Sequence, residues 1–201
     1  MIEYNYIGRL FQFKTDKTLF SPNGIDKGTE QMLNVVTFQH NDKLLDLGCG
    51  YGVVGIIAAQ IIKMDNVYMS DVSEIAIRLT VENVKYNGIH NPKVILSDGF
   101  SNINEKDFSL IISNPPYHED FKIPKEFIEN GFRHLKDGGK MYMVTKRKLW
   151  YMKKFIRVFG GVKVYEREGY FVFEAEKRSS NMNRNQKNKQ LSKKLSRKYG
   201  K

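Results

Sequence analysis

Three carboxylic acids stand at the ends of short apolar runs in this sequence: Asp46, Asp71 and Asp98. Short apolar runs that alternate with amphipathic stretches predict parallel strands joined by helices. Because the carboxyl ends of parallel strands meet at one edge of a sheet, we expect the three carboxylates to line a single crevice. Carboxylates accept hydrogen bonds from amino and hydroxyl groups and repel anions. The set therefore predicts a ligand with amino and hydroxyl groups.

A glycine-rich loop, LLDLGCGYG at residues 44–52, follows the first of these runs. Glycine there permits a tight turn and a close approach of the backbone to a ligand. Gly50, Gly52 and Gly55 also fit the spacing of a dinucleotide loop, so an NAD site is one alternative. Asp46 would repel a pyrophosphate, but its carboxylate can engage the amino acid part of a sulfonium cofactor. The loop therefore favours S-adenosylmethionine.

The other two acids fit the remaining parts of that cofactor. Asp71 can accept hydrogen bonds from both ribose hydroxyls, and Asp98 can accept one from the adenine amino group, with Phe100 packing on the ring. In the plainer alternative both acids only form turns, since Asp71 precedes Ser73 at a predicted helix start. The predicted cofactor-binding residues are Asp46, Gly48, Gly50, Asp71, Asp98, Phe100 and Asn114.

A rigid polar turn follows the apolar run 108–112 and contains Asn114, Pro115, Pro116 and Tyr117. Proline cannot extend a central strand, so the two prolines predict a stiff turn at the strand end. The Asn114 side-chain oxygen and the Pro115 carbonyl can accept both hydrogens of an exocyclic amino group, and Tyr117 can stack on a planar target. These four are the predicted catalytic residues.

Such a turn suits methylation of a weak nitrogen nucleophile, whose lone pair is delocalised. Two hydrogen bonds from the amino group favour a pyramidal nitrogen that points at the methyl donor, so no strong base is needed. Alignment alone can lower a barrier by about 7–11 kcal/mol. A paired base must first be flipped out of its helix.

The order of apolar and amphipathic stretches predicts an α/β fold with a doubly wound, mainly parallel seven-stranded sheet. The expected strands are 43–47, 67–70, 93–96, 108–113 and 140–145, with a closing antiparallel pair at 161–165 and 170–176. The expected helices are 53–62, 74–86, 125–135 and 150–159, preceded by a hairpin within 4–13 and a helix from about residue 27.

Charge and composition divide the chain into three parts. Residues 177–201 hold ten Lys or Arg and no acid, whereas the remainder has 23 basic and 22 acidic residues, so nearly all of the net charge of +11 lies in the last 25 residues. A polar, basic segment cannot repay its ordering entropy, which predicts disorder and a polyanionic partner. We expect an N-terminal extension at 1–26, a methyltransferase domain at 27–178 and a basic, disordered tail at 179–201.

Several classes of protein do not fit this composition. No run of about eighteen apolar residues and no secretory signal is present, so we expect a soluble, cytoplasmic protein with no membrane partner. Cys49 is the only cysteine, which excludes an internal disulfide and argues against a metal site. We interpret it as a small buried filler.

With these motifs in view, the sequence resembles the class I methyltransferases of the small-domain family, and among them the guanine-N2 methyltransferases of small-subunit rRNA. The likeness covers about residues 15–176 and includes LFSPNGIDKGTEQML, LLDLGCGYGVVGI, ISNPPYH, FRHLKDGGKMYMV and RKLWYMKKF. It implies cofactor contacts at Asp46, Gly48, Asp71 and Asp98, an acceptor base held by residues 114–117, and rRNA or a ribosomal subunit as partner. The familiar bacterial rRNA enzymes carry a second, degenerate methyltransferase-like domain before the catalytic one, whereas about twenty residues precede the expected catalytic domain here.

Other acceptors present the same amino group. A protein glutamine, methylated at N5, and adenine, methylated at N6, each offer two hydrogens to Asn114 and Pro115. An RNA-binding assembly factor without catalysis is a third alternative, which the intact loop and turn disfavour. The tail either adds phosphate contacts or only increases solubility.

Overall fold

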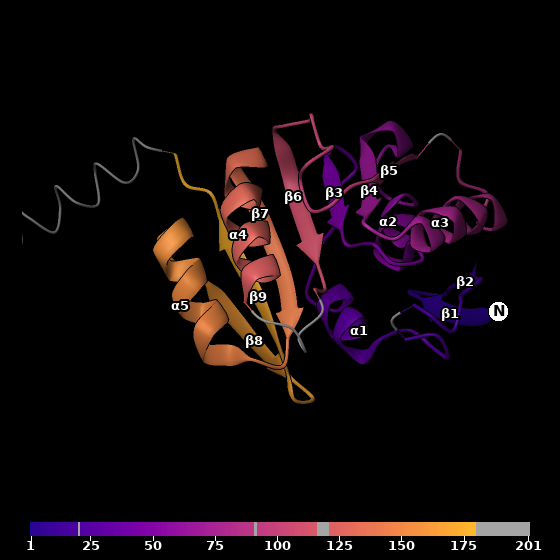
Figure 1. Cartoon of the computed structure of the whole chain (residues 1–201), viewed down its shortest axis with the longest axis horizontal. Coiled ribbons are helices and arrows are strands. Elements are labelled where there is room, and N and C mark those ends of the chain that lie inside the picture. The colour runs from indigo at the N-terminus through magenta and orange to yellow at the C-terminus, as the bar shows by residue number, and fades with distance from the viewer. Residues whose placement is uncertain (20, 91, 116–120, 180–201) are drawn as a thin grey trace, which may run out of the picture.

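The computed structural model describes residues 1–19, 21–90, 92–115 and 121–179. A seven-stranded sheet forms the centre of the molecule, in the order β5-β4-β3-β6-β7-β9-β8 (Figure 1). Its strands are β3 (Leu44–Leu47), β4 (Val67–Asp71), β5 (Lys93–Leu96), β6 (Phe108–Ser113), β7 (Leu135–Thr145), β8 (Lys163–Arg167) and β9 (Tyr170–Glu176). Strands β3 to β7 pair in parallel, whereas β9 runs antiparallel to both β7 and β8. The predicted doubly wound, mainly parallel sheet is confirmed.

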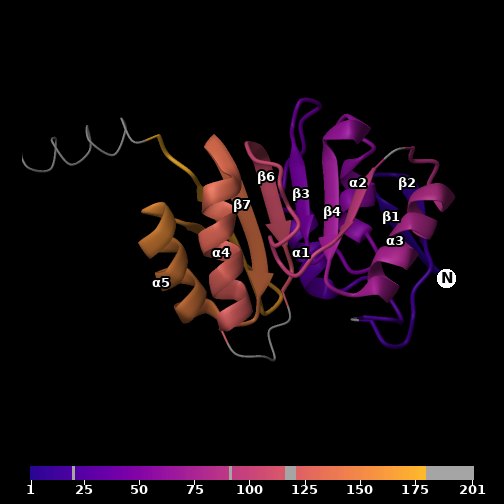
Figure 2. The same cartoon turned by 45° about the horizontal axis from the view of Figure 1, so that its top comes forward.

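Helices cover both faces of this sheet, which is why its central strands β3 and β6 are buried along their whole length. One face packs against α1 (Lys27–Leu33), α2 (Val53–Ala58) and α3 (Glu74–Tyr86). The other packs against α4 (Lys122–His134) and α5 (Lys148–Phe159), which lie side by side over the β7 region (Figure 2). The alternation of β3 illustrates the division, since Leu44 joins the first apolar cluster and Leu45 the second.

The N-terminal segment packs on the first face as the predicted hairpin. Strand β1 (Ile2–Tyr6) pairs antiparallel with β2 (Arg9–Phe13) through a two-residue turn. Phe11 and Phe13 are 2% and 0% exposed and belong to the same apolar cluster as α1 and α2. The hairpin therefore contributes to the core of the domain.

Helices α2 and α4 have bounds that differ from the prediction by three residues or more. Helix α2 ends at Ala58 instead of residue 62, because the amides of Ile61 and Ile62 both donate to the Ala58 carbonyl and close a turn, before a short 3-10 helix at Met64–Asn66. Helix α4 begins at Lys122 instead of residue 125, since Pro124 fits the first turn, where no amide donor is required.

The last part of the sheet also differs from the prediction. Strand β7 begins at Leu135 instead of residue 140, because Leu135 pairs with Phe108 before the register shifts. Strand β8 spans 163–167 instead of 161–165, since the two-residue turn after Arg167, with φ of 48° and 78°, fixes its pairing with β9. Helix α5 begins two residues earlier than predicted, after an extended Arg147.

Within the described ranges, no helix is long and apolar enough to cross a membrane.

Candidate active site

A cavity of about 360 Å³ lies at the carboxyl edge of β3, β4, β5 and β6. These strands are neighbours in the sheet, so residues that are far apart in the sequence meet around one space. Seven predicted site residues line the cavity: Asp46, Gly48, Gly50, Asp71, Asp98, Asn114 and Pro115. Pro116 and Tyr117 lie outside the described residues.

The glycine loop between β3 and α2 has a conformation that side chains resist. Gly50 and Gly52 have φ of 57° and 91°, in the left-handed region that favours glycine. A Cβ on Gly52 would also lie 2.9 Å from the Thr80 side chain. Thr80 Oγ1 in turn donates to the Gly50 carbonyl at 2.9 Å. The loop is therefore packed tightly against α3.

Asp46 is the most buried acid of the site, with 4% of its surface exposed. Its Oδ2 accepts a hydrogen bond from the Gly55 amide at 2.9 Å, in the first turns of α2. The pKa of Asp46 is raised to about 7, mainly by burial and to a lesser extent by the nearby Asp71 carboxylate, while the Gly55 hydrogen bond acts in the opposite direction. A cationic ligand group would favour the ionised carboxylate.

Asp71 ends β4 and is engaged by the backbone. Its Oδ2 accepts from the Gly50 amide and its Oδ1 from the Ser73 amide, both at 2.9 Å. Asp71 is therefore a turn residue ahead of α3, as the plainer interpretation of the sequence had it, and it also lines the cavity. An ionised carboxylate has about four acceptor sites, so two remain for a ligand.

Asp98 lines the cavity after β5, but Phe100 does not. The Phe100 ring packs against the His134 ring, with 4.5 Å between their centres. Phe127 on α4 lies at the cavity instead, and its ring is 3.3 Å from where a Cβ on Gly99 would be. Phe127, rather than Phe100, provides the aromatic surface next to the Asp98 loop.

Asn114 follows β6 and is tied to the start of α1. Its Nδ2 donates to Asp26 Oδ1 at 2.7 Å and to Thr29 Oγ1 at 3.0 Å. Both amide hydrogens are thereby used. Among the described residues Asn114 Oδ1 makes no hydrogen bond, which leaves this oxygen as an acceptor at the cavity.

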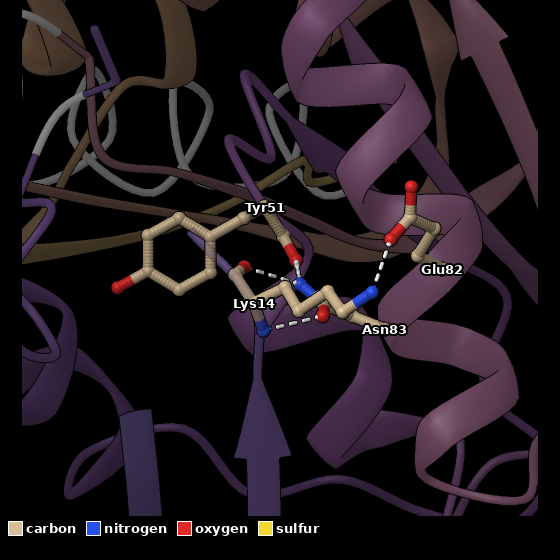
Figure 3. Close-up of polar contacts among 4 residues, drawn as sticks. All are labelled: Lys14, Tyr51, Glu82 and Asn83. Carbon is tan, nitrogen blue, oxygen red and sulfur yellow. Dashed lines mark hydrogen bonds and ion pairs between the residues drawn. The ribbon is translucent and has the colours of Figure 1, made fainter. Parts of the chain in front are cut away.

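Tyr51 connects the glycine loop to two other segments. Its carbonyl accepts from Asn83 Nδ2 at 2.9 Å, and the same Nδ2 also donates to the Lys14 carbonyl at 2.9 Å (Figure 3). Its hydroxyl donates to the Gly24 carbonyl at 3.2 Å. The loop is therefore fixed both to the end of the hairpin and to the segment that precedes α1.

Sequence reasoning assigned no role in the cavity to Asp26, Thr29 or Phe127. The only local signal was Asp26 at the start of a predicted helix, where it now caps α1 by accepting from the Thr29 amide at 3.0 Å. Cys49 is buried, and burial raises its pKa, as expected for a filler. Within the part of the chain that the structure describes, no cluster of His, Cys, Asp or Glu could hold a metal ion.

The sheet order, the glycine loop and the acids at successive strand ends define a class I, Rossmann-like methyltransferase fold. Residues 10–174 match the model of one family, the methyltransferase small domain, and the chain belongs to this family.

The chain is similar to one protein over most of that protein's length and to longer proteins over about half of theirs. It is 33% identical to Bacillus subtilis YbxB over 83% of the chain and 86% of that protein. It is 36% identical to the ribosomal RNA small subunit methyltransferase C of Hamiltonella defensa, over 82% of the chain and 50% of that protein. The chain therefore spans about half the length of the rRNA methyltransferases that it matches.

A solved structure has the same fold. The T. thermophilus 16S rRNA N2 methyltransferase RsmC, in complex with AdoMet and guanosine, superposes with a TM-score of 0.81 at 21% identity. The match covers 88% of the chain and 50% of RsmC.

Proposed function

We propose that this protein transfers a methyl group from S-adenosylmethionine to an exocyclic amino group of an RNA base, and specifically to guanine N2 in rRNA. One observation carries the proposal: Asn114 Oδ1, which accepts no hydrogen bond from the described residues, lines the same cavity as the strand-end carboxylates of Asp46, Asp71 and Asp98. Such a cavity suits a cationic donor with hydroxyl and amino groups next to a planar amine.

The donor side of the cavity fits the cofactor by the chemistry of its acceptors. In this proposal Asp46 and the glycine loop hold the amino acid part, Asp71 the ribose hydroxyls and Asp98 the adenine amino group, with Phe127 beside the ring. The bound cofactor supplies an electrophilic methyl group on a sulfonium. The buried Asp46 carboxylate adds attraction for the positive charge in a setting where water screens little.

The acceptor side aligns the nitrogen. Asn114 Oδ1 and the Pro115 carbonyl accept the two hydrogens of the amino group, which turns its lone pair toward the methyl group. As the nitrogen bonds to the methyl carbon, the bond from that carbon to sulfur breaks and a neutral thioether leaves, so the positive charge passes to the nitrogen, where the two oxygens stabilise it. The extra proton is then lost to water. Pro116 and Tyr117 complete the acceptor side in this proposal, with Tyr117 stacking on the base.

The relatives support the choice of base and polymer. The H. defensa relative is named as a small-subunit rRNA methyltransferase, and the T. thermophilus relative was solved with guanosine. We infer from these that the partner is rRNA or a ribosomal subunit, and that the protein acts in the cytoplasm. We further infer that residues 27–178 form the catalytic domain, behind the extension at 1–26, and that the basic tail from residue 179 adds phosphate contacts.

The decisive experiment offers labelled S-adenosylmethionine together with ribosomal subunits, naked rRNA, tRNA and total protein. The expected result is label in small-subunit rRNA, recovered as N2-methylguanosine after digestion to nucleosides. Label in protein glutamine or in N6-methyladenosine would assign the same site to another acceptor. Transfer to none of the four would reject the proposal.

A single substitution then tests the role of Asn114. Asn114→Ala should abolish transfer while the cofactor dissociation constant, measured by calorimetry, stays within about twofold, because Asn114 faces the acceptor. Equal loss of cofactor affinity and activity would move Asn114 to the donor side.

A further inference from the structure

Asp26 makes two hydrogen bonds with one oxygen atom. Its Oδ1 accepts from the Thr29 amide at 3.0 Å, which caps α1, and from Asn114 Nδ2 at 2.7 Å. Thr29 Oγ1 accepts the second Nδ2 hydrogen at 3.0 Å. The first turn of a helix in the N-terminal part thus meets, across 88 residues of sequence, the end of a central strand.

This contact decides which way the Asn114 amide points. An ionised carboxylate only accepts hydrogen bonds, so the Nδ2 end must face Asp26 and the Oδ1 end must face away from it. A flipped amide would present N–H groups to the amino group of the acceptor base. Two donors facing each other cannot form a hydrogen bond, so only the observed orientation serves the reaction.

The surrounding sequence keeps Asp26 in place. A Cβ on Gly28 would lie 2.9 Å from Asp26 Oδ1 and 3.0 Å from the Tyr170 ring, so a larger residue there would displace the carboxylate. On the other side, the Tyr51 hydroxyl holds the Gly24 carbonyl and so fastens the preceding turn to the glycine loop. The absence of a side chain at Gly28 thus leaves room for the Asp26 carboxylate, and the hydrogen bond of Tyr51 holds the turn that precedes it.

We propose that Asp26 is a positioning residue that orients the Asn114 amide for methyl transfer, with Thr29 Oγ1 as its second support. This inference rests on the proposed function and deepens it. The charge of Asp26 also acts on the reaction, because a carboxylate at the Nδ2 end polarises the Asn114 amide and strengthens its Oδ1 as an acceptor. Asp26 itself forms no bond to the reacting atoms in this scheme.

The test uses substitutions that keep the helix cap. Ser and Asn cap helices about as well as Asp, so α1 should remain stable in Asp26→Ser and Asp26→Asn. Serine is too short to reach Asn114, and we expect kcat to fall about 100-fold, the scale of a misplaced catalytic group. Asparagine keeps an acceptor but permits a flipped pair, and its expected loss is about tenfold. The cofactor dissociation constant and Tm should stay near those of the wild type.

Thr29 supplies a matched pair of variants. Thr29→Ser keeps the hydroxyl and should keep kcat, whereas Thr29→Val removes it at constant shape and should lower kcat. Because Thr29 and Asp26 hold the same amide, the loss in Thr29→Val combined with Asp26→Asn should be smaller than the product of the single losses. Multiplicative losses would contradict a shared action through Asn114.

One readout does not depend on activity. In protein labelled with ¹⁵N at asparagine, the Asn114 side-chain NH2 signal should be protected from solvent exchange in the wild type and lose that protection in Asp26→Ser. Unchanged protection, or wild-type kcat in Asp26→Ser, would overturn the inference. Wild-type protein that methylates no RNA would instead reject the proposed function, even if the NH2 signal behaved as expected.

Discussion

Asn83 pairs with the main chain of Lys14 in the way that one strand pairs with the next. Its Oδ1 accepts from the Lys14 amide at 2.6 Å, and its Nδ2 donates to the Lys14 carbonyl at 2.9 Å. One turn later, Asn87, the residue that follows the last turn of α3, does the same with the amide and carbonyl of Gln12. Four helical residues rise about 6.0 Å and two strand residues about 6.8 Å, so the two spacings nearly match. Two asparagines thereby close the outer edge of the hairpin.

Removing the Asn83 side chain should destabilise the whole domain. Asn83→Ala would leave the Lys14 amide, the Lys14 carbonyl and the Tyr51 carbonyl without a partner at a site where Asn83 is fully buried. A fully buried group without a partner costs about 1–3 kcal/mol, and water can partly replace Asn83 at the two part-buried Lys14 groups, so we expect the free energy of unfolding to fall by about 2–4 kcal/mol. Urea denaturation measures this change.

Asn87→Ala is the matched control for that experiment. Asn87 is half-buried and bonds Gln12 in the same manner, so water can replace it more easily. We expect a loss of about 1 kcal/mol. Equal losses in the two variants would show that the link to Tyr51 and the deeper burial of Asn83 contribute nothing.

Gly55 should not tolerate a methyl group. A Cβ there would overlap the Met69 side chain, which belongs to β4 and is fully buried. Alanine favours a helix over glycine by about 1 kcal/mol, but overpacking a core costs about 1–3 kcal/mol, and the rigid strand places this site at the upper end. Gly55→Ala should therefore lower the free energy of unfolding by about 1–2 kcal/mol. Gly161→Ala, where a Cβ meets only Arg178 at 3.7 Å, should change it by less than about 0.5 kcal/mol.

Asp46 should make the cofactor-free protein less stable as pH rises toward neutrality. Its pKa is about 7 in the folded protein and 3.8 ordinarily, so between these values the folded state binds more protons than the unfolded state. Its stabilising contribution is complete below the ordinary pKa and is lost as pH rises to about 7, by about 1.4 kcal/mol per pH unit. Relative to the wild type, Asp46→Asn should gain about 2–3 kcal/mol between pH 5 and 7.

Thermal or urea unfolding of both proteins across this pH range measures the difference between their free energies of unfolding. The other titrating groups are the same in both proteins, so their contributions cancel in this difference. A constant difference would mean that Asp46 is ionised throughout.

The bounds of a helix or strand were predicted correctly where the sequence itself marks both of its ends. Helix α3 has the predicted bounds because Ser73 caps it, accepting from the Ala76 amide at 3.3 Å. Strands β5, β6 and β9 also have the predicted bounds, since apolar runs or alternation mark both ends. The start of β7 was missed because its pairing with β6 includes a register shift, which the side-chain pattern does not encode.

The residues of the site could likewise be predicted only where the local sequence determines their position. Residues at strand ends, such as Asp46 and Asn114, were found because the position of a strand end can be predicted from its own sequence. Asp26 and Phe127 reach the cavity only through the docking of α1 and α4, and that docking depends on tertiary packing. Phe100 has the chemistry for a ring contact, but His134 occupies its face.

Deleting residues 179–201, which carry eight Lys or Arg, should weaken RNA binding and reduce its dependence on salt. The logarithm of the RNA-binding constant falls linearly with the logarithm of the salt concentration. Each phosphate contact that is lost should make this slope less steep by about 0.9 for a duplex or about 0.7 for a single strand. Unfolding of residues 1–178 should be unchanged. Equal slopes for the full and shortened proteins would assign the tail to solubility alone.

The antiparallel direction of β9 determines where such tail contacts would fall. The cavity lies at the end of the sheet where β6 finishes, whereas β9 finishes at the opposite end, where the Lys177 amide donates to the Gly139 carbonyl. Seven strand residues span about 20 Å or more, so the tail leaves the described part of the chain at least that far from the methyl acceptor. An RNA that contacts both the cavity and the residues where the tail begins would have to extend over at least this distance, so the tail would meet a part of the RNA that is distant from the methylated base.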